Sequence, residues 1–236
     1  MDAPSSSMSN NLSRGPSLRV SLAYVACMVL PVALVLAITS PKADAFISSI
    51  GPPRAATAQE QRAILMAVIE HEQSTERFPM FDEKGSRRVY ALEDTTALVC
   101  GTPRQEGSPC IDIMMSSTED VAKSLSAPSK LVAALPRFNA RQQPLEIQAL
   151  PGTILINRER IAAVFKKGGW EEFYRAYPQA AAILEFSRPA LSARGNQAVL
   201  YAAKSYGNLG GEGWVAVLVL QQGQWKVVSR LGLWVS

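Results

Sequence analysis

The sequence contains a single histidine, His71, among its 236 residues. Most protein zinc sites and serine triads need imidazole groups, so this scarcity excludes much of that chemistry. Neighbours at i±1 on a helix point away from each other, so Glu70 and Glu72 give His71 no partner, and we expect no metal site. Ser187 and Ser192 lie outside any Gly-x-Ser-x-Gly motif. Phosphate-binding and dinucleotide-binding motifs are also absent, so we expect no cofactor and no catalytic residue that can be named.

The net charge of the chain is also small. There are 24 Lys and Arg residues against 20 Asp and Glu residues, a formal net charge of +4. The basic pairs Arg87-Arg88 and Lys166-Lys167 are short and far apart. A nucleic-acid surface needs basic side chains gathered on one face, so we expect no nucleic-acid partner. A hydrophobic content of 47% is typical of a chain that folds around a core.

Residues 1–45 are typical of an export signal. An apolar stretch occupies 20–38, and Ala43 and Ala45 then place small side chains at the two positions that signal peptidase requires. The sequence therefore predicts cleavage directly after Ala45. The mature chain is expected to be periplasmic or secreted, in a bacterial cell envelope.

The length of the apolar stretch leaves an alternative. About 20 apolar residues cross a bilayer, and the stretch at 20–38 approaches that length. An uncleaved signal anchor would give a single-pass inner-membrane protein that contacts the membrane only through residues 20–38. In both cases Arg14 and Arg19 precede the stretch and keep the N-terminus inside, so the C-terminal domain lies outside.

Two cysteines, Cys100 and Cys110, remain after the export signal. An even number of cysteines in an oxidising compartment favours a disulfide. Strand-like runs at 97–100 and 110–115 flank a connection rich in Gly and Pro, which predicts a hairpin closed by the disulfide at its base. The spacing is not Cys-x-x-Cys, so a redox role is not expected.

The exported part divides into three segments. We expect a linker at 46–56, a region of helices and the cysteine hairpin at 57–153, and a C-terminal module at 154–236. The sequence predicts an α+β fold, with an antiparallel β-meander of about four strands packed by helices and a single signal or anchor helix at the N-terminus.

A helix is predicted from Thr57, because Glu60 follows at the spacing of a capping box. Apolar side chains then recur at helical spacing and indicate a buried face. These are Ile64, Leu65, Val68 and Ile69. The charged residues of this segment, Glu72 among them, are expected on the opposite, solvated face.

The C-terminal module begins with two helical segments separated by Gly168-Gly169. The second segment carries four aromatic residues on one face, which we expect to cover the sheet. They are Trp170, Phe173, Tyr174 and Tyr177. Strand patterns follow at 183–191, 197–205, 214–220 and 225–234, with a long glycine-rich loop at 206–213 and an irregularity near Gly232.

Three strings of this module, FSRPALS at 186–192, GEGW at 211–214 and GQWKVV at 223–228, occur in a characteristic order. They resemble a C-terminal module of uncharacterised exported bacterial proteins, and the resemblance covers residues 154–236. It implies export but no activity. Members often carry cysteines around the glycine-rich loop, and residues 206–210 contain none. The last string also resembles the hairpin of nuclear-transport-factor-2-like domains.

Glu212 is the carboxylate of most interest, because it lies among glycines that allow a ligand to approach the backbone. We expect Arg188 on a neighbouring strand, so that the two form either a polar pocket or a structural ion pair. A hydrolase would use Glu212 with Glu185 or Arg188.

Four aromatic residues complete the candidate ligand site. They are Trp170, Tyr174, Tyr206 and Trp214. They are expected either to stack on a ligand or to pack in the core. The sequence as a whole favours a non-catalytic binding or interaction module of the bacterial cell envelope, whose partner is an unknown envelope protein or ligand. The alternatives are an extracytoplasmic hydrolase acting on an envelope polymer and a small-ligand carrier with a cone-like sheet.

Overall fold

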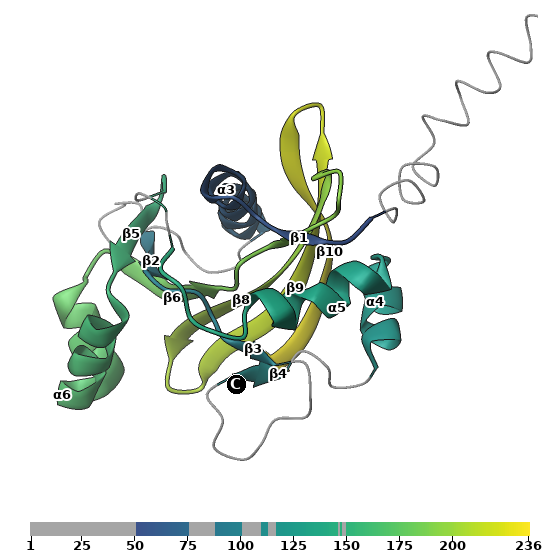
Figure 1. Ribbon diagram of the computed structural model, residues 1–236. Coiled ribbons are helices and arrows are strands. Elements are labelled where there is room, and N and C mark those ends of the chain that lie inside the picture. Colours follow the sequence, from purple (N-terminus) through teal and green to yellow (C-terminus); the bar gives the residue numbers. More distant parts are fainter. Residues whose placement is uncertain (1–50, 76–87, 101–109, 113–116, 146, 148–149) are drawn as a thin grey trace, which may run out of the picture. The chain divides into compact units, whose positions relative to one another are not determined.

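Figure 1 shows the computed structural model, which describes residues 51–75, 88–100, 110–112, 117–145, 147 and 150–236. The chain divides into two compact units, Met1–Asp44 and Ala45–Ser236, and all described residues belong to the second. The predicted export signal, its cleavage site at Ala43 and Ala45, and the apolar stretch at 20–38 lie outside the described residues. No helix of the described part is long and apolar enough to cross a membrane.

The second unit has an α+β fold, as predicted, with helices packed on a large sheet. Its described helices are α3 (Ala58–Thr75), α4 (Thr118–Leu125), α5 (Ser129–Phe138) and α6 (Arg158–Ala176). The strands of the large sheet are β1 (Arg54–Ala55), β2 (Val89–Glu93), β5 (Thr153–Ile156), β6 (Ala180–Phe186), β7 (Ala190–Leu191), β8 (Gln197–Gly207), β9 (Gly210–Gln221) and β10 (Gln224–Val235). A separate pair consists of β3 (Val99–Cys100) and β4 (Ile111–Asp112).

The large sheet is mixed and has eight strands among the described residues, so the predicted meander of about four strands is only part of it. β6, β8, β9 and β10 do pair antiparallel in that order. On the other side of β6, however, β2 and β5 pair parallel, and α6 connects β5 to β6. Parallel strands need a crossover rather than a tight turn, and α6 supplies it.

The predicted loop at 206–213 is wrong, because β8 continues to Gly207 and β9 begins at Gly210. Only Asn208 and Leu209 form a turn, and two of the glycines make room for rings. A Cβ on Gly210 would lie 2.6 Å from the ring of Tyr206, and a Cβ on Gly213 would meet the indole of Trp234. The predicted irregularity near Gly232 is confirmed by a register shift at that residue.

Cys100 and Cys110 form the predicted disulfide, with their Cα atoms 5.7 Å apart. The predicted hairpin is wrong, because Val99 pairs with Ile111 in a parallel ladder. A two-residue hairpin loop would force antiparallel pairing, whereas a separation of 10 residues does not.

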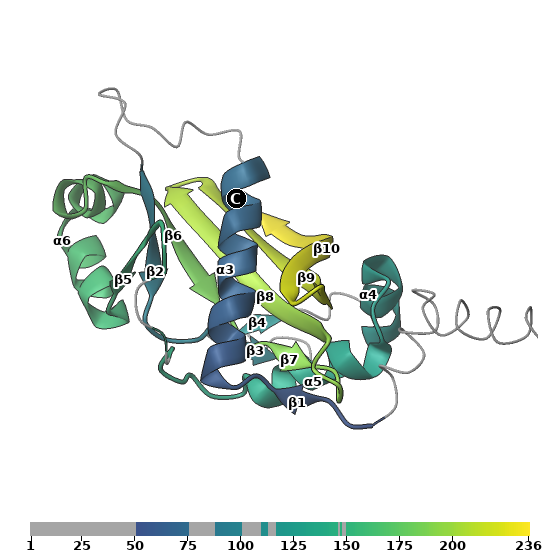
Figure 2. The ribbon, with the colours of Figure 1, turned by 90° about the horizontal axis from the view of Figure 1, so that it is seen from above.

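Helices cover both faces of the large sheet (Figure 2). Strand residues alternate between the faces, so Leu92 and Leu184 point toward α3 while their neighbours Ala91 and Ile183 point toward α6. We call the α3 side the first face and the opposite side the second face. Farther along the second face, α4 and α5 pack on β8 and β9 around Tyr201.

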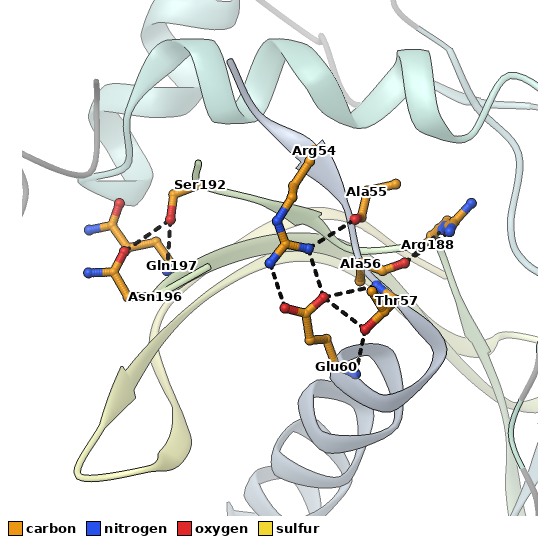
Figure 3. A network of polar contacts seen from close by, with 9 residues as sticks. All are labelled: Arg54, Ala55, Ala56, Thr57, Glu60, Arg188, Ser192, Asn196 and Gln197. Carbon is orange, nitrogen blue, oxygen red and sulfur yellow. Dashed lines mark hydrogen bonds and ion pairs between the residues drawn. The ribbon is translucent and has the colours of Figure 1, made fainter. Parts of the chain in front are cut away.

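The predicted capping box opens α3 (Figure 3). The backbone N–H of Thr57 donates to Glu60 Oε2 at 2.9 Å, and the backbone N–H of Glu60 donates to Thr57 Oγ1 at 3.3 Å. The guanidinium of Arg54 also pairs with Glu60 and holds the pKa of that carboxyl down, at about 2. Arg54 lies in β1, which pairs with β7, so the end of the predicted linker at 46–56 belongs to the sheet.

The predicted glycine break divides α6. Gly168 and Gly169 have non-helical backbone angles, and the positive φ of Gly169 favours glycine. After the break, Phe173 is fully buried against the sheet. The prediction that this aromatic segment covers one face of the sheet is therefore confirmed.

Candidate functional site

Glu212 and Arg188, the predicted pair, do not meet. Glu212 lies on β9 and binds Lys204 Nζ at 3.3 Å and Arg230 Nη2 at 2.6 Å. The guanidinium of Arg188 donates to the carbonyl of Ala56 at 2.9 and 3.2 Å and to Gln143 Oε1 at 3.0 Å (its contact with Ala56 is drawn in Figure 3). The prediction of an Arg188–Glu212 pocket or ion pair is wrong, because Arg188 is used to hold the chain that leads into α3.

Glu212 instead belongs to a network of four charges on the first face, which we call the α3 network: Glu72, Lys204, Glu212 and Arg230. Glu72 accepts from Lys204 Nζ at 3.3 Å and from Arg230 Nη1 at 3.0 Å. Its predicted solvated position is wrong, since only 2% of the residue is exposed. Two acids face two bases, so the network neutralises itself, which is typical of a structural role.

The four predicted aromatic residues pack within the protein. Trp214 is buried, and the guanidinium of Arg230 lies 3.9 Å from the centroid of its ring. The rings of Trp170 and Tyr174 are stacked at 5.7 Å, and the Tyr174 hydroxyl donates to the carbonyl of Tyr206 at 2.8 Å. These contacts correspond to the core-packing alternative for the aromatic set.

The carboxylate pair expected of a hydrolase is also separated. Glu185 is opposite Ala203, whereas Glu212 is opposite the next residue, Lys204. Successive residues of a strand point to opposite faces, so Glu185 lies on the second face and Glu212 on the first. The two side chains therefore cannot act on one bond.

A different group of polar residues gathers where the parallel strands end. Glu93 ends β2, and Asp94 follows it; Asn157 and Arg158 follow β5, and Glu185 lies near the end of β6. We call these five residues the strand-end cluster. In sheets with parallel strands, the carboxyl ends are where ligands usually bind, because side chains from several strands meet there.

Backbone pairing brings the two glutamates together. Leu92 of β2 is opposite Leu184 of β6, so the residues that follow, Glu93 and Glu185, lie side by side on the second face. Arg158 Nη1 is 3.4 Å from an oxygen of each carboxylate. These distances exceed the roughly 2.7–2.9 Å of strong charge-assisted hydrogen bonds. One nitrogen atom, Arg158 Nη1, is therefore shared by two carboxylates, and both contacts are long.

Asp94 and Asn157 position the arginine. Asp94 accepts from the backbone N–H of Arg158 at 3.2 Å and from the side-chain amide of Asn157 at 3.0 Å. Asn157 in turn caps α6, since its side-chain oxygen accepts from the backbone N–H of Arg160 at 3.2 Å. The start of α6 is thus held firmly beside the two glutamates.

Burial perturbs the two glutamates. Their side chains are 13% exposed for Glu93 and 23% for Glu185, while that of Arg158 is 42% exposed. Burial, followed by the charge of Glu185, raises the pKa of Glu93 to about 7. Burial also raises the pKa of Glu185, against the influence of Arg158. Three acidic groups and one basic group leave this cluster short of positive charge, unlike the α3 network.

Tyr201 is a buried hydroxyl residue on the second face. It is fully buried and receives a hydrogen bond from Trp234 Nε1 at 3.1 Å. Burial raises the pKa of Tyr201, and the charge of Glu185 raises it further, so the hydroxyl lies within electrostatic reach of the cluster.

Sequence reasoning missed the strand-end cluster for a topological reason. The available signal is the apolar run of β2 followed directly by Glu93 and Asp94, but the predicted antiparallel meander does not include the parallel pairing of β2 with β5 and β6. The described residues contain no group of three or more His, Cys, Asp or Glu side chains that could hold a metal ion.

Comparison of the chain with protein-family models, with curated proteins and with solved structures found no significant match.

Proposed function

We propose that this protein is an extracytoplasmic binding module of the bacterial cell envelope, and that it binds a positively charged ligand group at the strand-end cluster. The observation that carries the proposal is the pair of partly buried carboxylates, Glu93 and Glu185, whose side chains are 13% and 23% exposed and which share one distant guanidinium. Burying a carboxylate is costly unless a positive charge or hydrogen-bond donors compensate it. A ligand cation would supply the missing compensation.

Binding is tested with the purified full-length chain in detergent, using methylguanidinium and methylammonium as cationic probes and acetate as the anionic control. We expect both cations, but not acetate, to raise the melting temperature, because a ligand of the folded state stabilises it. The double variant Glu93→Gln/Glu185→Gln should abolish the shift. If acetate stabilises the chain equally, or if the double variant responds like the wild type, the proposed site is wrong.

A matched control is available on α6. Glu171 and Glu172 are also two carboxylates that share one guanidinium, that of Arg175, but here the Glu171 and Arg175 side chains are 84% and 62% exposed. Exposed ion pairs of this kind contribute little. The variant Glu171→Gln/Glu172→Gln should therefore leave the cation-induced shift unchanged.

The location is a separate part of the proposal. It is supported by the apolar stretch at 20–38, by the Ala43 and Ala45 site, and by a disulfide between the two cysteines that follow. Cell fractionation should recover the chain from the envelope or the periplasm. Replacing Ala45 with Leu should leave a heavier, membrane-bound chain if the signal is normally cleaved, and recovery of the wild type from the cytosol would overturn this part.

A second candidate function is an extracytoplasmic hydrolase. The specific observation in its favour is that Glu93, with a pKa of about 7, is paired with another carboxylate, as in acid-base hydrolysis of glycosidic bonds. This proposal moves the catalytic pair from Glu212 and Glu185 to Glu93 and Glu185. It predicts release of reducing ends from envelope polysaccharide, with separate pH profiles for Glu93→Gln and Glu185→Gln. Absence of release by the wild type would exclude it for that substrate.

The carrier alternative has less support. A cone-like sheet would enclose its ligand on its concave side, but α3 packs on the first face with Ile64 and Leu65 fully buried. Quenching of tryptophan fluorescence by apolar small molecules remains its test.

A further inference from the structure

We propose that Arg158 is a placeholder: its guanidinium occupies the position that the charged group of the ligand takes, and the ligand enters by displacing it. This inference rests on the proposed function, because it concerns the same two carboxylates. It adds the ligand's chemical class, an organic guanidinium or primary ammonium group, and the competitor that the ligand must overcome.

The first argument is that Arg158 compensates the carboxylates poorly. Its Nη1 atom lies 3.4 Å from both Glu93 Oε2 and Glu185 Oε1, and neither contact is a bidentate pair of parallel hydrogen bonds. Glu93 Oε2 is buried and has no hydrogen-bond partner among the described residues. A cation with freedom to settle between the carboxylates would satisfy both oxygens at shorter range.

The second argument concerns the freedom of the Arg158 side chain. Its backbone is fixed by Asp94, whereas its side chain is 42% exposed and projects from the first residue of α6. The guanidinium can therefore turn into solvent without unwinding the helix. A positive charge is also disfavoured at a helix N-terminus, where the helix dipole is itself positive.

The third argument identifies the ligand class. The protein's own stand-in at this position is a guanidinium, whose planar donors suit two neighbouring carboxylates. A primary ammonium offers three donors to the same oxygens. Asp94 is engaged by the Asn157 amide and the Arg158 backbone N–H, so two carboxylates remain for the ligand. Two carboxylates suit an organic cation better than a hard metal ion, which takes about six oxygen ligands.

The test is a calorimetric titration of the full-length chain with methylguanidinium. Removing the competitor in Arg158→Ala should tighten binding by up to about fivefold relative to the wild type, the upper end of what a weak ion pair contributes. Arg158→Gln keeps a polar side chain without the charge, and it should tighten binding of methylguanidinium as Arg158→Ala does. It is measured as well in case Arg158→Ala fails to fold.

The matched control is Arg160→Ala. Arg160 is an exposed residue of the same helical turn, and its removal takes away the same charge without opening the site. Affinity should then change by less than about twofold, because exposed charges are screened. If Arg160→Ala raised the affinity for methylguanidinium as much as Arg158→Ala does, the gain would come from the lost net charge alone, and the placeholder proposal would be overturned.

The two proposals fail in different ways. If the wild type binds methylguanidinium and the Arg158 variants bind it equally or more weakly, the placeholder is wrong while the cation site stands. If neither the wild type nor the folded Arg158 variants bind, the proposed function is wrong, and the placeholder with it.

Discussion

Replacing Glu72 with glutamine removes one charge from the α3 network while keeping the shape of the side chain. Glu72 is 2% exposed and accepts from Lys204 at 3.3 Å and from Arg230 at 3.0 Å. Removing one partner of a buried ion pair typically costs about 3–5 kcal/mol, because the other charge stays buried without compensation. The loss here should be smaller, because Glu212 remains within 3.3 Å of Lys204 and 2.6 Å of Arg230.

We therefore expect Glu72→Gln to lower the free energy of unfolding by about 2 kcal/mol. In a chain of this size that corresponds to a fall in melting temperature of roughly 4–8 °C. The assay is urea denaturation followed by tryptophan fluorescence and by far-UV circular dichroism, with coincident transitions as the check of two-state behaviour.

Glu171→Gln is the matched control, because Glu171 pairs with Arg175 on the surface of α6. Its loss should be at most about 0.5 kcal/mol. If Glu72→Gln destabilised the chain no more than Glu171→Gln, the α3 network would contribute no more than a surface pair, and the argument from burial would be refuted.

Three further predictions concern the rest of the described unit. The pKa of Glu93 is about 7 in the folded chain against a usual 4.5, so the free energy of unfolding should fall as pH rises from about 4.5 to about 7. Glu93→Gln should remove this pH-dependent loss, which is about 2 kcal/mol. Parallel stability curves of the wild type and the variant from pH 5 to 8 would contradict this. Gly213→Ala should cost about 1–3 kcal/mol in urea denaturation, because a Cβ meets aromatic side chains, whereas Gly232→Ala, with open space, should not. Replacing Cys100 and Cys110 with serine should cost about 3 kcal/mol, and equal midpoints with and without the disulfide would oppose this.

Local signals in the sequence predict local structure well. The capping box of Thr57 and Glu60 opens α3, and the Gly168-Gly169 pair breaks α6. Each rests on residues only a few positions apart, so it depends little on how distant parts of the chain pair. The disulfide is also predicted, because only two cysteines follow the export signal.

Predictions that depend on distant pairing fail. Glu72 is predicted to be solvated when α3 is considered alone, and its burial follows from Lys204 and Arg230, which lie 132 and 158 residues away. The glycines between Tyr206 and Trp214 have the composition of a loop, but three of them, Gly210, Gly211 and Gly213, face aromatic side chains of neighbouring residues and strands. Composition alone does not distinguish glycines that form a loop from glycines that leave room for neighbouring side chains, and the tertiary structure does.

The two charge clusters show why the candidate site could not be found by judging residues singly. Glu212 has the more conspicuous sequence context, yet it lies in a network where two acids meet two bases. Glu93 has a plain context at the end of an apolar strand, yet parallel pairing sets it beside Glu185, with Asp94 next to it. Among the described residues, Arg158 is the one base paired with the two glutamates. A balanced buried network is complete without a ligand, whereas an unbalanced one is stabilised by whatever brings the missing charge. Charge balance within each cluster is therefore the property that separates a structural network from a candidate binding site in this fold.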